Sequence, residues 1–246
     1  MVKNFFIFAG ANGSGKTSLY RALKDAFKSF PFVNADEMLR DIIGNNDPAN
    51  AKLGQELANR KIDECFQEGT SFVFETVFSH ESKVDLVKRA KLLGYAVSIY
   101  FVHLSDASEN VIRVKRRAEL GGHDVPQAKV LSRIPRTLVN VKAALKLVDD
   151  FYLFENDFAS GHRLVAYRRP LSPIVVTVDA PPWTREMTRL GNEIELVPGT
   201  MAPSGRGLGA AEGARHRTCV RCGRFLRGKA RIYFRVCSVC QPKLDR

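Results

Sequence analysis

The chain has 246 residues, of which 45% are hydrophobic, and it carries a formal net charge of +12. This composition is sufficient for a packed core, so it excludes a wholly disordered protein, and the absence of a run of about 18 apolar residues excludes a transmembrane helix. The apolar stretch that ends before Gly10 is too short for a signal peptide, so we expect a cytoplasmic protein that makes no contact with a membrane.

Short apolar runs alternate with helical patterns along the first 180 residues. The expected strands cover residues 4–9, 71–75, 95–102, 151–154 and 163–167. The expected helices cover residues 17–29, 37–43, 47–69, 81–93, 107–120 and 127–149, the last of them interrupted at Pro135. Alternation of this kind predicts an α/β fold with a mostly parallel sheet.

A phosphate-binding loop follows the first expected strand, where Gly10-Ala11-Asn12-Gly13-Ser14-Gly15-Lys16-Thr17 fits G-x-x-x-x-G-K-[ST] in full. Its backbone N–H groups and the N-terminus of the next helix are predicted to hold phosphate. Lys16 is predicted to bind the β- and γ-phosphates, and Thr17 to bind Mg²⁺. Because no guanine-reading motif occurs, we expect ATP as the nucleotide, bound by residues 10–18 including Ser18, and a three-layer P-loop NTPase fold.

Polar residues follow a short apolar segment at 32–33 and the expected strand at 71–75. Asp36 lies twenty residues beyond Lys16, where a small-molecule kinase needs a carboxylate to accept the proton of a substrate hydroxyl. The alternative is that Asp36 caps the helix that follows it. Glu75 and Thr76 end the strand at 71–75, and because strand ends of a parallel sheet line the site crevice, we expect them to contact substrate or a metal-bound water, unless they form an ordinary exposed strand end.

An arginine-rich helix, a glycine pair and a second helix follow between residues 107 and 149. Arginines stabilise the charge that develops on the γ-phosphate oxygens, so this segment predicts a lid over the nucleotide. Any single arginine here is alternatively part of a solvated face. His103 ends the strand before the lid and either faces the crevice or is a buried core histidine.

Six motifs in this order resemble the zeta toxin family over residues 3–170. They are G-A-N-G-S-G-K-T at 10–17, N-A-D-E at 34–37, F-E-T at 74–76, F-V-H-L-S-D at 101–106, R-V-K-R-R at 113–117 and G-G-H-D-V-P at 121–126. The resemblance implies an ATP-dependent kinase that phosphorylates a hydroxyl of a small molecule, such as the UDP-sugar UDP-N-acetylglucosamine. It also implies an antitoxin protein as partner.

The resemblance further implies a role for each matching residue. Lys16 is similar to the phosphate-loop lysine and Asp36 to the catalytic base, and Glu75 and Thr76 match substrate-contacting positions. Arg117 and Arg133 resemble the two catalytic lid arginines, with Arg116 and Arg136 as the alternatives that the motifs leave open.

The end of the chain has a different composition. Residues 181–246 hold thirteen Lys or Arg and five Asp or Glu, a net charge of +8, and four of the five cysteines. We expect a kinase domain at 1–180, a linker at 181–215 that includes a stretch rich in Gly, Ala and Pro, and a separate module at 216–246. Cys65, the remaining cysteine, lies on the apolar side of an expected helix and is predicted to be a core residue.

The last module contains two C-x-x-C pairs separated by fourteen residues: Cys219 with Cys222, and Cys237 with Cys240. This spacing predicts a structural Zn²⁺ with four cysteine ligands in a zinc-ribbon-like module. The arginines and aromatic residues between the pairs fit a nucleic acid as partner, or else a basic surface that docks an acidic protein. Two other functions therefore stay open beside the kinase: a nucleic-acid-associated P-loop ATPase, and a module that only senses nucleotide.

Overall fold

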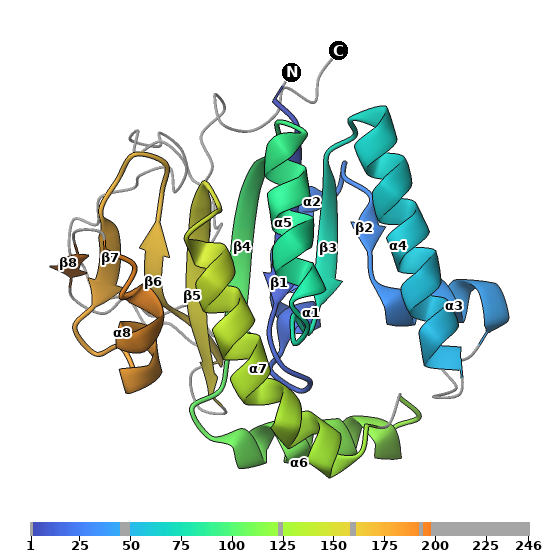
Figure 1. Cartoon of the computed structure of the whole chain (residues 1–246). Helices are drawn as coiled ribbons and strands as arrows, with labels where there is room; N and C mark the ends of the chain where they lie inside the picture. Colours follow the sequence, from blue (N-terminus) through green and yellow to red (C-terminus); the bar gives the residue numbers. More distant parts are fainter. Residues whose placement is uncertain (1, 45–49, 123–124, 158–160, 192–193, 198–246) are drawn as a thin grey trace.

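Apolar strands that alternate with helices form one eight-stranded sheet in the computed structural model, which describes residues 2–44, 50–122, 125–157, 161–191 and 194–197 (Figure 1). The strand order is β2-β3-β1-β4-β5-β6-β7-β8. The strands are β1 (Asn4–Ala9), β2 (Phe32–Val33), β3 (Phe72–Thr76), β4 (Ala96–His103), β5 (Asp150–Asp157), β6 (Gly161–Arg168), β7 (Ile174–Thr177) and β8 (Ile194–Val197). The first five in the order are mutually parallel, β6 is antiparallel to both of its neighbours, and β8 is parallel to β7.

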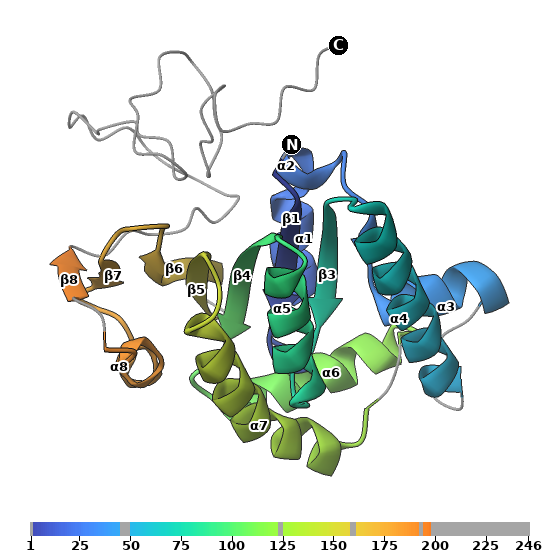
Figure 2. The ribbon, with the colours of Figure 1, turned by 45° about the horizontal axis from the view of Figure 1, so that its top comes forward.

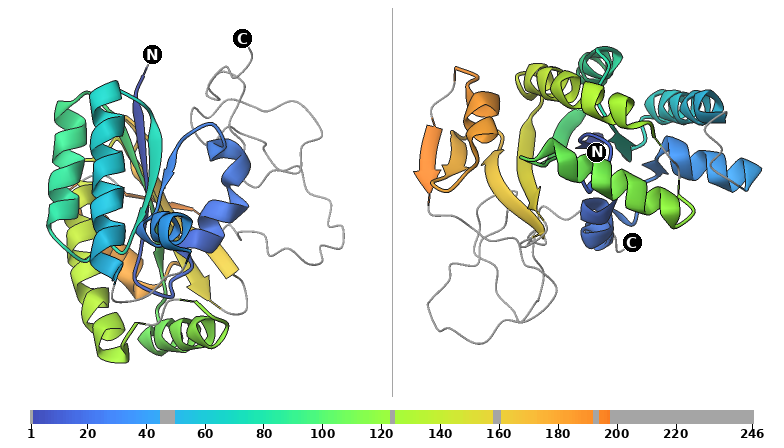
Figure 3. Two further views of the ribbon diagram at one scale, coloured as in Figure 1. Left: turned by 90° about the vertical axis from the view of Figure 1, so that its right-hand side faces the viewer. Right: turned by 90° about the horizontal axis from the view of Figure 1, so that it is seen from below.

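Helices cover both faces of the parallel part of the sheet (Figure 3). They are α1 (Lys16–Ala22), α2 (Lys24–Phe27), α3 (Ala35–Ile43), α4 (Ala51–Glu68), α5 (Ser82–Leu92), α6 (Ala107–Glu119), α7 (Gln127–Leu145) and α8 (Pro182–Thr188). Helices α4, α5 and α7 lie on one face and α1 and α2 on the other. None of these described helices is long and apolar enough to cross a membrane.

The two faces of the sheet bury separate apolar clusters, as the alternation along β1 illustrates. Phe5 and Ile7 point into the larger cluster with α4, α5 and α7, whereas Phe6 and Phe8 point into the smaller one with α1 and α2. A strand that is buried on both faces reads as a continuous apolar run, as this one does. The fold is therefore the three-layer α/β arrangement with a mostly parallel sheet that the sequence predicts.

Two predicted helices differ in the structure. The helix expected at 17–29 is divided at Leu23 into α1 and α2. The second lid helix is continuous through Pro135, so the predicted interruption is wrong. Pro135 lies on the exposed side of α7, and the helix continues through it although proline has no N–H to donate.

The folded body extends beyond the boundary predicted at residue 180. Helix α8 and strand β8 occupy the first part of the range expected to be a linker, and β8 pairs with β7. Met187 is 2% exposed and Trp183 packs against the larger cluster, so this segment closes the core at the β6–β7 end. A linker therefore cannot begin at residue 181, and burial of these apolar side chains is the physical reason.

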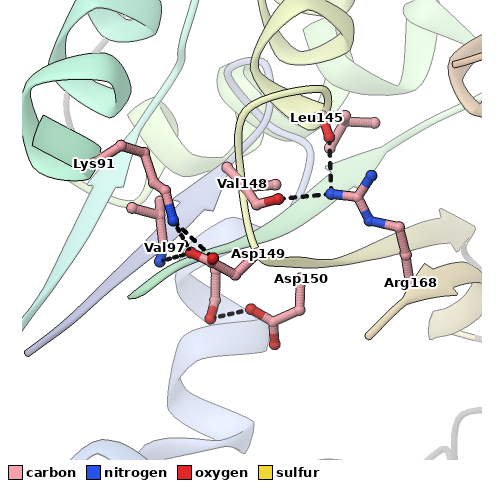
Figure 4. Close-up of polar contacts among 8 residues, drawn as sticks. Lys91, Val97, Leu145, Val148, Asp149, Asp150 and Arg168 are labelled. Carbon is pink, nitrogen blue, oxygen red and sulfur yellow. Dashed lines mark hydrogen bonds and ion pairs between the residues drawn. The ribbon is translucent and has the colours of Figure 1, made fainter. Parts of the chain in front are cut away.

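A group of polar contacts ties the amino end of β5 to its surroundings (Figure 4). The Asp149 carboxylate accepts hydrogen bonds from Lys91 Nζ at 2.6 Å and from the Val97 N–H at 2.7 Å. The Arg168 guanidinium donates to two backbone carbonyls at the end of α7, those of Leu145 and Val148. These contacts join α5, β4, β6 and α7 at the end of the sheet opposite to the phosphate loop.

Candidate active site

The phosphate loop lies at the carboxyl end of β1, between that strand and α1, with α6 across the same end of the sheet (Figure 2). Gly13 has a φ of 76°, and a Cβ there would lie 2.4 Å from the backbone oxygen of Asn110 on α6. Asn110 in turn donates from Nδ2 to the Asn12 carbonyl at 2.8 Å. Gly13 is therefore required at this position, because α6 packs directly against the backbone of the loop.

Lys16 is buried and folds back over the loop, with Nζ donating to the Ala11 carbonyl at 3.0 Å. Burial lowers the pKa of Lys16, and the nearby Glu75 and Asp36 carboxylates oppose this shift. Arg117 and Arg133 lower the pKa of Lys16 further through their positive charges. Charged residues from β3, α3, α6 and α7 thus act on one ammonium group.

Glu75 points from the end of β3 toward the loop, and its Oε1 accepts from Thr17 Oγ1 at 2.7 Å. Burial raises the pKa of Glu75, while Lys16 and the bond from Thr17 oppose the rise. Among the described residues, Glu75 Oε2 and Ser14 Oγ are buried without a hydrogen-bond partner. Buried polar atoms are normally satisfied, so these two indicate a site built to receive further polar groups.

These donors fit a magnesium–nucleotide complex. The Thr17 hydroxyl and the Glu75 carboxylate are the hard oxygen ligands that Mg²⁺ prefers, directly or through water. The described part of the chain contains no group of three or more His, Cys, Asp or Glu that could hold a metal by itself.

Asp36 lies in the first turn of α3, where the sequence predicts either that it acts as a base or that it caps the helix. The N-cap of α3 is Asn34, whose Oδ1 accepts from the N–H groups of Asp36 and Glu37 at 2.8 and 3.0 Å. The Asp36 carboxylate is therefore not needed to cap the helix. It raises the pKa of both Lys16 and Arg133, which places its charge beside the loop and the lid.

The four lid arginines differ in how they relate to the phosphate loop. Arg133 is half-buried and donates to Asn12 Oδ1 at 3.0 Å, and burial lowers its pKa. Arg136, one turn later, is exposed and bonds back to Ser132 on its own helix. Arg116 and Arg117 are both exposed, and of the two it is Arg117 whose charge lowers the pKa of Lys16.

Thr76 has a different environment from its neighbour Glu75. Its Oγ1 accepts from the N–H of Phe78 at 3.2 Å, in a turn where Phe78 has a φ of 61°. Two side chains of α7 hold the same turn, because Thr137 donates to the Val77 carbonyl at 3.0 Å and Asn140 to that of Phe78 at 3.3 Å. Thr76 thus shapes the turn beside the site and lies half-buried at its edge.

His103 is a buried core residue, the second of its two predicted alternatives. Its ring packs against Phe101 and Trp183, at centroid distances of 5.9 and 4.9 Å. Burial lowers its pKa to about 4. Cys65, 1% exposed inside the larger cluster, is the core residue that the sequence predicts.

Several predictions fall outside the described residues. The four cysteines of the expected zinc site, Cys219, Cys222, Cys237 and Cys240, lie there together with the basic and aromatic residues between them. His123 and Asp124 of the Gly-Gly-His-Asp-Val-Pro motif lie there as well. The zinc and nucleic-acid predictions therefore stay predictions.

Comparisons with known proteins agree with this geometry. A family model described as Zeta toxin matches residues 3–158. An uncharacterized protein of Haemophilus influenzae is 27% identical over 131 residues, which are 52% of this chain and 89% of that protein.

Two crystal structures have a similar fold, each at a TM-score of 0.59. A chain of the AvrRxo1-ORF1:AvrRxo1-ORF2 structure with sulphate ions is 18% identical, over 76% of this chain and 64% of that chain. The structure of the same pair with ATP is 19% identical, over 82% of this chain and 67% of that chain. This chain thus spans about two thirds of those longer proteins.

Proposed function

The chain belongs to the zeta toxin family, and from this premise and the site geometry we propose that it is an ATP-dependent kinase that phosphorylates a hydroxyl of a small molecule. One observation carries the proposal: Asp36 is not the N-cap of α3, and its charge acts on both Lys16 and Arg133. A base in that position removes the proton of an acceptor hydroxyl as the phosphoryl group arrives.

The other residues have matching roles in this proposal. The loop amides and Lys16 hold the β- and γ-phosphates, while Thr17 and Glu75 hold Mg²⁺, which neutralises phosphate charge when bound. Arg117 and Arg133 stabilise the negative charge that develops on the γ-phosphate oxygens. Glu75 and Thr76 define the edge of the acceptor site. The acceptor that we propose is a UDP-sugar such as UDP-N-acetylglucosamine, on the basis of family membership.

The test is transfer from ATP to a panel of UDP-sugars, other nucleotides and dinucleotides, read by mass spectrometry. We expect Asp36→Asn to lower the transfer rate by about 10²- to 10⁴-fold, the usual contribution of a general base, with unchanged affinity for ATP. Asp41→Asn, an exposed change on the same helix α3, is the matched control and should keep the wild-type rate. Full transfer activity in Asp36→Asn would refute the role of Asp36, and failure of every acceptor would refute the kinase.

Two further proposals concern partners. The solved AvrRxo1-ORF1 is in complex with AvrRxo1-ORF2, which supports a protein partner for this chain too, and we propose an antitoxin. We also propose that residues 216–246 bind one Zn²⁺ through the two C-x-x-C pairs, because four thiolates at this spacing form a closed tetrahedral site. Zinc in such a site is structural and takes no part in phosphoryl transfer.

A further inference from the structure

Two side chains from the β5–β6 hairpin contact the backbone of the phosphate loop. Asn156 and His162 face each other as a register pair across the two strands. Asn156 Nδ2 donates to the Ser14 carbonyl at 2.6 Å, and His162 Nε2 lies 2.9 Å from the Gly15 carbonyl. No sequence motif includes either residue, and the site as described above does not use them.

The donor and acceptor in the histidine contact follow from chemistry. A carbonyl oxygen only accepts, so His162 must carry its proton on Nε2. Burial is the main cause that lowers the pKa of His162, and its neighbour Arg113 adds to this, while the bond to Gly15 opposes it. The ring therefore acts as a neutral donor near pH 7. Asn156 is 6% exposed, so its donor is held away from competing water, and His162 is half-buried.

Because the peptide group is planar, these two contacts also fix the orientation of the loop N–H groups. The C=O of Ser14 and the N–H of Gly15 share one rigid plane, as do the C=O of Gly15 and the N–H of Lys16. A donor that fixes the carbonyl on the outside of the loop thereby fixes the N–H that points to the other side. Hydrogen bonds to the carbonyl also polarise the peptide and strengthen its N–H as a donor.

We propose that Asn156 and His162 are positioning residues for ATP, which orient the Gly15 and Lys16 amides toward the phosphates. This inference rests on the proposed function. Gly15 supports it, because its φ is 99° and a Cβ there would lie 2.2 Å from Asn156 Nδ2 and 3.0 Å from His162 Nε2. The hairpin thus approaches the loop as closely as glycine permits. Arg113 of α6 donates to the Asn156 carbonyl at 3.2 Å, which ties the lid to the same hairpin.

The experiment measures ATP affinity by calorimetry on the full chain without acceptor, with thermal unfolding as a parallel readout. Asn156→Asp keeps the size of the side chain but replaces the donor by an acceptor. His162→Leu removes the second donor, whereas His162→Gln retains an N–H at a similar reach. We expect Asn156→Asp and His162→Leu to weaken ATP binding at least about tenfold, and His162→Gln to restore most of it.

The outcomes are distinct. In active variants the KM for ATP should rise while the KM for the acceptor stays near the wild-type value, a split that general loss of structure would not produce. Variants that fold and bind ATP as tightly as the wild type, or a His162→Gln variant as weak as His162→Leu, would overturn the positioning role and leave the kinase proposal intact. A wild-type chain that binds no ATP would overturn both.

Discussion

Arg133 and Arg136 lie one helical turn apart, yet only the first contacts the phosphate loop. Because arginine acts on a transferring phosphoryl group through direct contact, we expect Arg133→Ala to lower the transfer rate by about 10²-fold or more. Arg136→Ala should stay near the wild-type rate, since that guanidinium bonds to its own helix. Steady-state kinetics with saturating ATP checks the pair, and equal losses in the two variants would contradict the assignment. The same comparison of Arg117→Ala with Arg116→Ala tests the arginines of α6.

Sequence patterns identified the residues of the phosphate loop but could not decide between neighbours. The sequence favours Asp36 as a base but leaves a helix cap open, and the structure shows Asn34 at that cap. Asn110, Asn156 and His162 carry no signal in a single sequence, because their contacts join residues that are 98 to 147 positions apart. Chain folding alone brings such residues to the loop.

At the scale of elements, the burial of His103 between β4 and α8 has a consequence for stability. Its pKa is about 4 in the folded chain and about 6.5 when unfolded, so the unfolded state binds the proton more readily between those values. Above pH 6.5 the neutral His103 does not lower the free energy of unfolding. As the pH falls from 6.5 toward 4, proton uptake by the unfolded state lowers that free energy. The shift corresponds to roughly 3 kcal/mol, because one pKa unit is worth about 1.4 kcal/mol.

Urea unfolding at a series of pH values isolates this effect when His103→Phe is compared with the wild type. The phenyl ring retains contact with Phe101 and Trp183 but takes up no proton. We expect the variant to gain stability relative to the wild type as the pH falls from 6.5 to 4. A difference between the two chains that is constant with pH would contradict the prediction.

The polar contacts around Asp149 make a second prediction about elements. Asp149→Ala leaves the Val97 N–H without its acceptor, so we expect a loss of about 1–3 kcal/mol in the free energy of unfolding. Asp63→Ala is the matched control, because it breaks the exposed pair with Arg89 and should cost no more than about 1 kcal/mol. Denaturant titration measures both, and equal costs would show that the backbone contact does not stabilise the sheet.

The elements that the sequence predicted best are those with long apolar patterns. The strands β1, β3 and β4 and the helices α4 to α6 lie within a few residues of the expected ranges. Strands β7 and β8 were not expected, since each has four residues and β8 is largely exposed on its side chains. Such short strands form because a neighbouring strand already offers its backbone groups, and a single sequence does not show that neighbour.

For the whole molecule, the net charge of +12 gave little information about the site. The charges that act on one another around the phosphate loop are three cations, Lys16, Arg117 and Arg133, and two carboxylates, Asp36 and Glu75. The excess of one positive charge, together with the loop amides, is suited to triphosphate. The larger share of the net charge, +8 of +12, belongs to residues 181–246, which the kinase proposal does not require.

Truncation tests this division of the chain. We expect residues 1–197 to fold and to bind ATP like the full chain, because every described element is retained. A chain of residues 1–180 removes α8 and β8, so the core around Met187 is exposed and the thermal midpoint should fall by several degrees or the chain should aggregate. The proposed zinc adds a second readout, since the full chain purified without chelator should carry one zinc per chain by metal analysis and residues 1–197 none. Equal stability of the two truncated chains would contradict the extended boundary, and a full chain without zinc would contradict the metal site.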